Sequence, residues 1–171
     1  MIKKVIICLF LIILVAAGYN FYPEKTLPAD CVVDSIAVHK NSRKMFAYSS
    51  GRLMKEFVIS LGKNPAGHKQ FEGDGKTPEG IYFITTKSAK SGFHKNLGIS
   101  YPNGIDQANA KKKNKSPGGD VKIHGLKNGL GFIGKFQRLK DWTNGCIALT
   151  NAEVDDLYNH IELGCTITII P

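Results

Sequence analysis

A cysteine at a polar turn is the residue of this sequence whose setting most suggests chemistry. Cys146 follows a glycine in the stretch DWTNGCIALTN, residues 141–151, between polar residues and an apolar step. A structural cysteine usually lies among apolar neighbours, whereas a turn exposes the sulfur as a nucleophile requires. Cys146 is therefore the candidate nucleophile. Gly145 lets the turn present the sulfur and leaves backbone N–H groups free to hold a developing oxyanion.

A cysteine attacks a carbonyl as its thiolate, so a base must lie within reach of the sulfur. His124 ends a short β-rich segment and precedes Gly125, where the missing side chain permits close approach. A glycine-rich stretch, GLKNGLGFIGKF, separates this histidine from Cys146 and can fold the two side chains together. A core histidine held by a backbone hydrogen bond is the alternative, but the pairing with Cys146 favours a general base.

The other histidines offer weaker chemistry. His39 and His160 are interpreted as surface or packing residues. His68 lies near Glu72 and Asp74 on a glycine-rich loop, which is a poor set of metal ligands. No CxxC spacing indicates a zinc or redox site. The sequence therefore predicts neither a metal nor another cofactor.

The N-terminus predicts export. Residues 1–18 contain two lysines, an apolar run over residues 5–17 and then a small residue, which is typical of a secretory signal cleaved before Tyr19. The run is short for a membrane-spanning helix of about 20 residues, and a retained inner-membrane signal anchor is the alternative. Residues 19–30 are interpreted as a linker and residues 31–171 as one catalytic domain. The periplasm or cell envelope is the expected location.

The composition narrows the class of partner. A hydrophobic content of 43% with 22% charged residues is that of a globular domain. The net charge of +9 favours polyanions. Because an exported domain does not meet nucleic acid, an acidic envelope polymer is the expected partner of this charge.

Two further cysteines of the exported domain raise the question of a disulfide. Cys31 just precedes the first expected strand and Cys165 begins the last. If these strands are parallel neighbours, the two strand starts can lie within disulfide distance. The alternative is two small buried residues, and the sequence leaves both open.

The pattern of short apolar segments predicts a mostly β fold, a small sandwich or barrel-like structure with a few short helices. Thr150 is the expected N-cap of a helix, with Glu153 as its capping-box partner and Gly164 at its end. A second helix is expected over residues 105–113. The expected strands are residues 32–39, 45–51, 55–62, 80–86, 121–125 and 165–170.

The segments IHG (123–125) and TNGCIAL (143–149) resemble the L,D-transpeptidase catalytic-domain family. That family has a histidine–glycine pair, a spacer, and then Ser/Thr-x-Gly-Cys followed by an apolar residue. Supporting stretches in the same order are GHKQFEGDGKTPEGIYFI, FHKNLGISYPNGIDQANA, SPGGDVKIHG and DWTNGCIALTNAEVDDLY. The resemblance runs from about residue 32 to the C-terminus and implies the family's β-sandwich or barrel-like fold.

What the resemblance implies is cysteine acyl transfer on peptidoglycan stem peptides. Cys146 would attack the carbonyl of the L-residue in an L-to-D peptide bond and expel a terminal D-amino acid. The thioacyl-enzyme would then be resolved by the amine of a second stem peptide, by another amine or by water. His124 would act as base and later as acid, and the Gly125 carbonyl would orient its ring.

The resemblance also implies supporting residues. Thr143 matches the family's Ser/Thr and would support the turn. His94 and Tyr101 lie in a stretch that the family places near the substrate cleft. The implied oxyanion donors are the N–H groups of three consecutive residues, Asn144, Gly145 and Cys146.

Two positions depart from the best-characterised members of the family. Asn144 and Ala148 stand where those members have a histidine and an arginine or asparagine. An L,D-carboxypeptidase or amidase that hydrolyses wall peptides with the same Cys146–His124 pair is therefore an alternative. A non-catalytic wall-binding module is a third, in which the thiol would react no faster than an ordinary cysteine.

Overall fold

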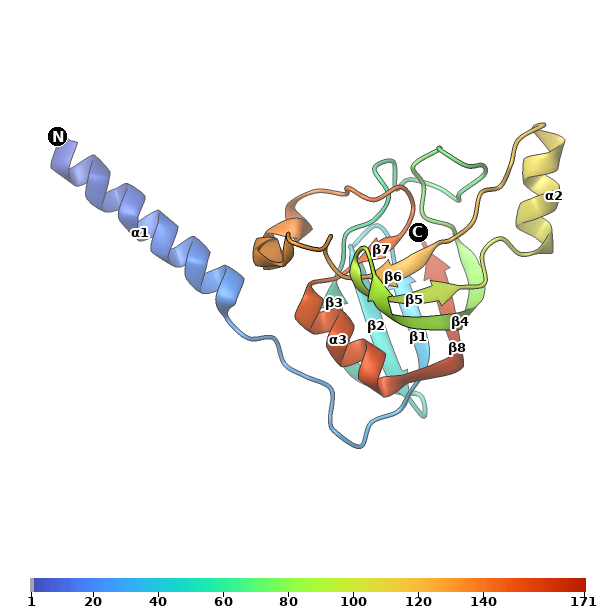
Figure 1. Cartoon of the computed structure of the whole chain (residues 1–171), viewed down its shortest axis with the longest axis horizontal. Helices are drawn as coiled ribbons and strands as arrows, with labels where there is room; N and C mark the ends of the chain where they lie inside the picture. Colours follow the sequence, from blue (N-terminus) through green and yellow to red (C-terminus); the bar gives the residue numbers. More distant parts are fainter. Residues whose placement is uncertain (1) are drawn as a thin grey trace.

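The structure is a computed structural model and describes residues 2–171. An N-terminal helix, α1 (Ile2–Phe21), projects from a domain built on one curled eight-stranded sheet (Figure 1). Three short helical segments accompany the sheet. The predicted mostly β, barrel-like fold with a few short helices is confirmed.

The elements of the domain follow in chain order. The strands are β1 (Val33–His39), β2 (Lys44–Ser49), β3 (Arg52–Val58), β4 (Gly80–Ser91), β5 (His94–Ile99), β6 (Lys122–His124), β7 (Ile147–Ala148) and β8 (Ile161–Ile170). The helical segments are α2 (Gly104–Lys112), the 3₁₀ segment η1 (Gly131–Leu139) and α3 (Asn151–His160).

The sheet curls until its two ends meet. Its order is β3-β2-β1-β8-β4-β5-β6-β7, with β1–β8 and β6–β7 parallel and the other neighbours antiparallel. The chain that follows β3 reaches β7, where Ser60 and Ala148 exchange two N–H···O bonds of 3.1 and 2.8 Å. This bridge joins the two ends of the sheet and explains its barrel-like form.

The core lies inside the curl. Alternate residues of each strand point inward because side chains alternate between the faces of a strand. On β1, Ile36 and Val38 are buried, and Ile167 and Ile169 are buried beside them on β8. The apolar alternation of the sequence therefore builds the scaffold on which the polar turn around residue 145 is held.

Helix α3 begins as predicted but ends earlier. The Thr150 hydroxyl accepts the Glu153 N–H at 3.3 Å, and the Glu153 carboxylate accepts the Thr150 N–H at 3.1 Å, so the capping box is confirmed. The predicted end at Gly164 is wrong. The helix ends at His160 because Ile161 already pairs with β1, and Gly164, at φ +87°, lies within β8.

Three elements of the domain are absent from the sequence prediction, and the shortest is the two-residue strand β7. Strand β5 has no clear alternation, and η1 occupies the stretch interpreted as a glycine-rich loop. Helix α2 matches the helix expected over residues 105–113, and Asn103 caps its N-terminus.

The disulfide hypothesis required β1 and β8 to be parallel neighbours, and they are. However, β8 starts at Ile161, which pairs with Val33, so Cys165 lies well inside the strand rather than at its start. Cys31 and Cys165 are both buried free thiols in the structure. Burial raises the pKa of Cys165 to about 12, which makes this thiol a poor nucleophile.

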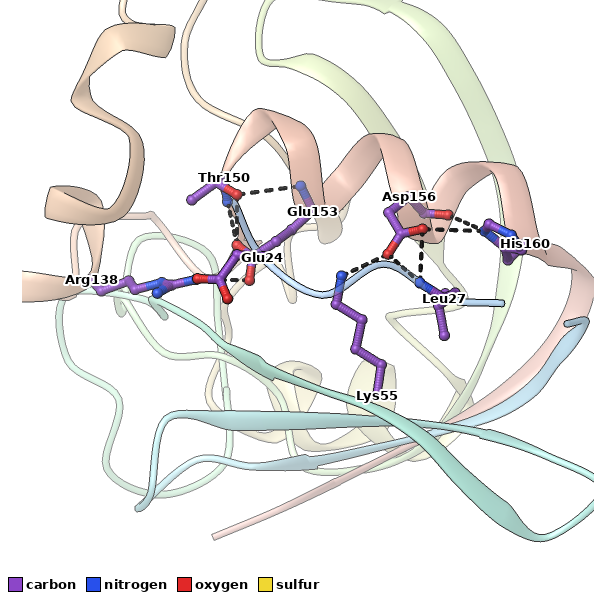
Figure 2. A network of polar contacts seen from close by, with 8 residues as sticks. All are labelled: Glu24, Leu27, Lys55, Arg138, Thr150, Glu153, Asp156 and His160. Atoms are coloured by element: carbon purple, nitrogen blue, oxygen red, sulfur yellow. Dashed lines mark hydrogen bonds and ion pairs between the residues drawn. The ribbon is translucent and has the colours of Figure 1, made fainter. Parts of the chain in front are cut away.

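The segment interpreted as a linker packs against the domain. Leu27 is buried, and its N–H donates to both carboxylate oxygens of Asp156 at 3.1 and 3.3 Å. The same carboxylate pairs with Lys55 at 2.6 Å, where both side chains are only 7% exposed. Figure 2 shows the segment running between α3 and the sheet, held by this buried ion pair.

Candidate active site

The parallel pair β6–β7 brings the predicted nucleophile and base together. His124 at the end of β6 is in register with Ala148 of β7. Cys146 lies two residues before Ala148, so the alternation of side chains places its sulfur on the same face as the imidazole. Both side chains line one cavity of about 480 Å³.

The His124 ring is held in one orientation. Its Nδ1 lies 2.6 Å from the Gly125 carbonyl oxygen, the contact expected from the sequence. A carbonyl only accepts, so Nδ1 carries the proton and Nε2 keeps its lone pair in the neutral ring. The side chain is buried, and this burial lowers the pKa of His124 below its ordinary value, although the Gly125 carbonyl opposes the shift. The imidazole is therefore neutral at physiological pH and able to accept a proton.

Two aromatic rings lie against the imidazole, and neither was predicted from the sequence. The ring centroids of Phe93 and Trp142 lie 4.8 and 5.7 Å from that of His124. The indole Nε1 donates to the Gln137 side chain of η1 at 3.1 Å, which fixes the ring. Trp142 is the only tryptophan of the chain and lies four residues before the nucleophile, so its position was the available signal.

The turn that carries the nucleophile is stabilised by hydrogen bonds within the turn and to neighbouring segments. The Thr143 hydroxyl accepts the Gly145 N–H at 3.1 Å and donates to the Cys146 carbonyl at 2.7 Å. Asp141, at the start of the turn, accepts the Leu61 N–H at 2.9 Å and pairs with Arg43 at 2.7 Å. The turn is therefore tied both to itself and to the chain that follows β3.

Gly145 is sterically required. Its φ is +133°, and a Cβ at this position would lie 2.7 Å from the Lys76 carbonyl oxygen. The Gly145 N–H, expected as an oxyanion donor, is already used by Thr143. In the described part of the chain, the N–H groups of Asn144 and Cys146 donate no hydrogen bond, so these two are the donors available to an oxyanion.

The Cys146 sulfur is partly exposed and lies 3.8 Å from the Asp120 carbonyl oxygen. Burial raises the pKa of this thiol, and the negative charge of Asp120 adds to the shift, while the backbone of Lys122 and the charges of Lys122 and Lys69 oppose it. The resting sulfur is therefore a protonated thiol. A base must remove its proton during attack.

Cys146 lies where two cavities meet. The second cavity, of about 630 Å³, extends from the sulfur toward Lys69, Asp74 and Gly118. Four residues line both cavities: Lys63, Asp120, Asn144 and Cys146. The Lys63 ammonium donates to the Asn144 side chain at 3.2 Å across this junction. A chain-like substrate can therefore approach the sulfur from two sides.

Comparison with known proteins agrees with this geometry. The pattern of the L,D-transpeptidase catalytic domain (YkuD) matches residues 34–170. The chain belongs to this family. It is also 26% identical to the "putative L,D-transpeptidase YafK" of Escherichia coli over 132 residues, 74% of this chain and 46% of that protein.

Solved structures share the fold. The helical cell shape determining protein Pgp2 (K307A mutant) from Campylobacter jejuni matches with a TM-score of 0.61 at 24% identity, over 90% of this chain and 52% of that one. Bd1075 of Bdellovibrio bacteriovorus gives 0.58 at 24%, over 85% and 52%. An L,D-transpeptidase of Mycobacterium smegmatis gives 0.53 at 13%, over 80% and 58%. The chain spans about half the length of the relatives that it matches.

Two residues that the family resemblance places near the substrate cleft have structural partners. His94 pairs through Nε2 with the Asp155 carboxylate of α3 at 2.9 Å. Tyr101 is buried, and its hydroxyl donates to the Pro117 carbonyl at 2.9 Å. Neither is among the residues that line the two cavities containing Cys146, and a role of either side chain in substrate binding stays a prediction.

The weak candidate metal ligands named from the sequence do not come together in the structure. His68 accepts the Glu79 N–H at Nδ1 and lies 3.1 Å from Asp106 at Nε2. Asp74 instead pairs with Lys69 and accepts backbone N–H groups of its own loop. Within residues 2–171, no group of three or more His, Cys, Asp or Glu could hold a metal ion.

Proposed function

We propose that this protein is an L,D-transpeptidase that transfers the acyl group of a peptidoglycan stem peptide through a Cys146 thioester. The observation that carries the proposal is the registered β6–β7 pair, which places Cys146 and a carbonyl-oriented His124 on one face of one cavity. Membership of the family supports the substrate class. The periplasm or cell envelope, where stem peptides occur, is the proposed location.

The first half-reaction begins with both groups neutral. Because burial opposes charge on the thiol and on the imidazole alike, the proton moves to His124 Nε2 as the sulfur attacks the L-residue carbonyl. The N–H groups of Asn144 and Cys146 stabilise the resulting oxyanion. His124 then protonates the leaving amine, so a D-amino acid departs and a thioester remains.

The second half-reaction consumes the thioester. An acceptor amine attacks the thioester carbonyl and gives its proton to His124, which returns it to the departing Cys146 sulfur. The product is a new amide bond. If water is the acceptor, the same steps release a carboxylate, and the enzyme is an L,D-carboxypeptidase or amidase.

Product analysis decides between transfer and hydrolysis. Incubation of purified tetrapeptide muropeptides with the full chain and a labelled D-amino acid is expected to give exchanged or cross-linked products, measured by mass spectrometry. Tripeptides alone would assign the hydrolase. No product with any stem peptide, from a folded protein, would favour the non-catalytic wall-binding module.

The pH profile tests the base. We expect kcat/KM to fall at low pH with a midpoint below about 6.5, because the lowered pKa of His124 keeps the ring neutral until the solution is more acidic than a free imidazole requires. Activity is present above this midpoint and lost as pH falls through it, as His124 is protonated.

A Trp142→Leu variant provides the matched measurement. Loss of the indole admits water to the imidazole. The midpoint at which kcat/KM of the variant falls at low pH should therefore rise toward about 6.5. A wild-type midpoint above that value would contradict the assignment of the buried His124 as the base.

A further inference from the structure

The 3₁₀ segment η1 exposes several large apolar side chains beside the N-terminal helix. Its Gln137 side chain is buried against the domain, and its Lys135 side chain is buried against the end of α1 and the segment that follows it. Phe132, by contrast, is 69% and Leu139 is 82% exposed. We call these exposed side chains together the η1 face: Phe132, Phe136, Leu139 and Leu130, which directly precedes the segment. Water-exposed phenylalanine and leucine side chains grouped on one short element are typical of an interaction surface.

Asn20 of α1 forms hydrogen bonds with the backbone of η1. Its side-chain oxygen accepts the Lys135 N–H at 2.8 Å, and its amide nitrogen donates to the Phe132 carbonyl at 3.1 Å. Gly134, at φ +49°, provides the space, because a Cβ there would lie 2.6 Å from the Asn20 oxygen. The Asn20 side chain therefore holds the last turn of α1 to the main chain of η1.

Charged and aromatic contacts strengthen the same junction. The Lys135 ammonium donates to the Tyr22 carbonyl at 2.7 Å and pairs with Glu24 at 3.1 Å. Arg138 joins Glu24 to the buried Glu153 of α3, with both ion pairs at 2.8 Å (Figure 2). The position of α1 relative to η1 is thus set by several independent contacts.

Helix α1 has the length and surface of a membrane span. Its 20 residues are predominantly apolar, and none is buried by the domain. The apolar run of residues 5–17 is short for a span, but the helix continues beyond it at both ends, and its 20 residues at about 1.5 Å each give about 30 Å, the hydrocarbon thickness of a bilayer. Tyr19 lies in its last turn and Tyr22 directly follows it, at the end near the domain, where tyrosines favour the interface between lipid and water.

We propose that α1 is retained as a membrane anchor and that the η1 face lies in the headgroup region of the same bilayer. In Figure 1, the orange segment of residues 131–139 lies beside the domain end of α1, on the side of the molecule opposite α2. The partner is a lipid surface because the face is continuous with α1: Tyr19 packs near Phe136, with ring centroids 6.3 Å apart. Exposed Lys127 and Lys140 flank η1 in the sequence and suit anionic headgroups.

The proposal has a consequence for the catalytic cleft. Leu130 of the η1 face also lines the cavity that contains His124 and Cys146. Docking of the face therefore holds one wall of this cavity close to the membrane surface. The membrane contact does not depend on which acyl acceptor the enzyme uses.

Tryptophan probes in the full chain test the contact. Phe132→Trp and the control Ile105→Trp, which is on α2 and 72% exposed, are reconstituted in vesicles of phosphatidylethanolamine and phosphatidylglycerol. Brominated phosphatidylcholine is then added to the lipid mixture, and the wild-type emission is subtracted. Brominated lipid should quench the fluorescence of the probe at position 132, and acrylamide should not. The probe at position 105 should be quenched by acrylamide and not by brominated lipid.

Other outcomes overturn the proposal. Equal acrylamide access for the two probes would mean that the η1 face stays in water. Protection from both quenchers that grows with the protein-to-lipid ratio would assign the face to a second copy of the chain. An intact mass of the protein from cell membranes that begins at Tyr19 would show that α1 is removed, whereas one that includes residues 2–18 supports the anchor.

Discussion

Replacement of Cys146 with alanine is expected to reduce turnover of a muropeptide substrate to the uncatalysed rate while leaving the fold intact. The thioester cannot form without the sulfur, and this partly exposed side chain contributes little to the core. Product formation by mass spectrometry and thermal unfolding by circular dichroism measure the two effects. Cys8→Ala, which removes an exposed thiol of α1 outside the domain, is the matched control and should keep full activity.

The base is tested in the same series. His124→Gln should cost about 10²–10⁴-fold in kcat, the usual value of general-base assistance. The double variant should be no less active than Cys146→Ala alone, because nucleophile and base act as one unit and their losses do not add. A His124→Gln enzyme with more than about a tenth of the wild-type rate would exclude His124 as the base.

Slow alkylation of Cys146 does not distinguish an enzyme from a wall-binding module. The sequence suggested that a catalytic thiol would be labelled faster than an ordinary one. In the structure, burial raises the pKa of Cys146, so a catalytic thiol that relies on His124 during attack is also labelled slowly at rest. Turnover is therefore the measurement that separates the two hypotheses.

The features that could be predicted from the sequence are those that depend on residues close together in the chain. The capping box of Thr150 and Glu153 follows from residue types at fixed spacing, and the structure contains it. The contact between His124 and the Gly125 carbonyl is similarly local, since it joins neighbouring residues. The apolar alternation was enough to predict a mostly β fold.

What the sequence missed depends on contacts between distant segments. Phe93 reaches His124 only because β5 pairs with β6, and no local pattern indicates that pairing. The early end of α3 has the same cause, because pairing of Ile161 with Val33 overrides the glycine stop signal at Gly164. A hydrogen bond from Gly145 to Thr143, rather than any residue type, decides which N–H groups of the turn remain free.

Gly145→Ala is expected to be strongly damaging although it leaves both reacting side chains in place. The new Cβ would lie 2.7 Å from the Lys76 carbonyl oxygen, a backbone atom that cannot rotate away, at a φ of +133°. The turn must therefore shift, and the shift moves the Cys146 sulfur together with the free N–H groups on either side of Gly145. Because a displacement of about 1 Å can cost about 10²-fold, kcat should fall by at least that order, with a loss of about 1–3 kcal/mol in stability.

The matched control for Gly145→Ala is Gly51→Ala, in the β2–β3 turn. Gly51 also has a positive φ, +74°, but a Cβ there has no atom within 4 Å. This variant bears the backbone strain without the collision, so it should lose stability of the same order and keep wild-type kcat. Steady-state kinetics and thermal unfolding of the two variants separate misplacement of the turn from general destabilisation. If Gly145→Ala kept the wild-type kcat, the rigid presentation of Cys146 by this turn would not be what the reaction requires.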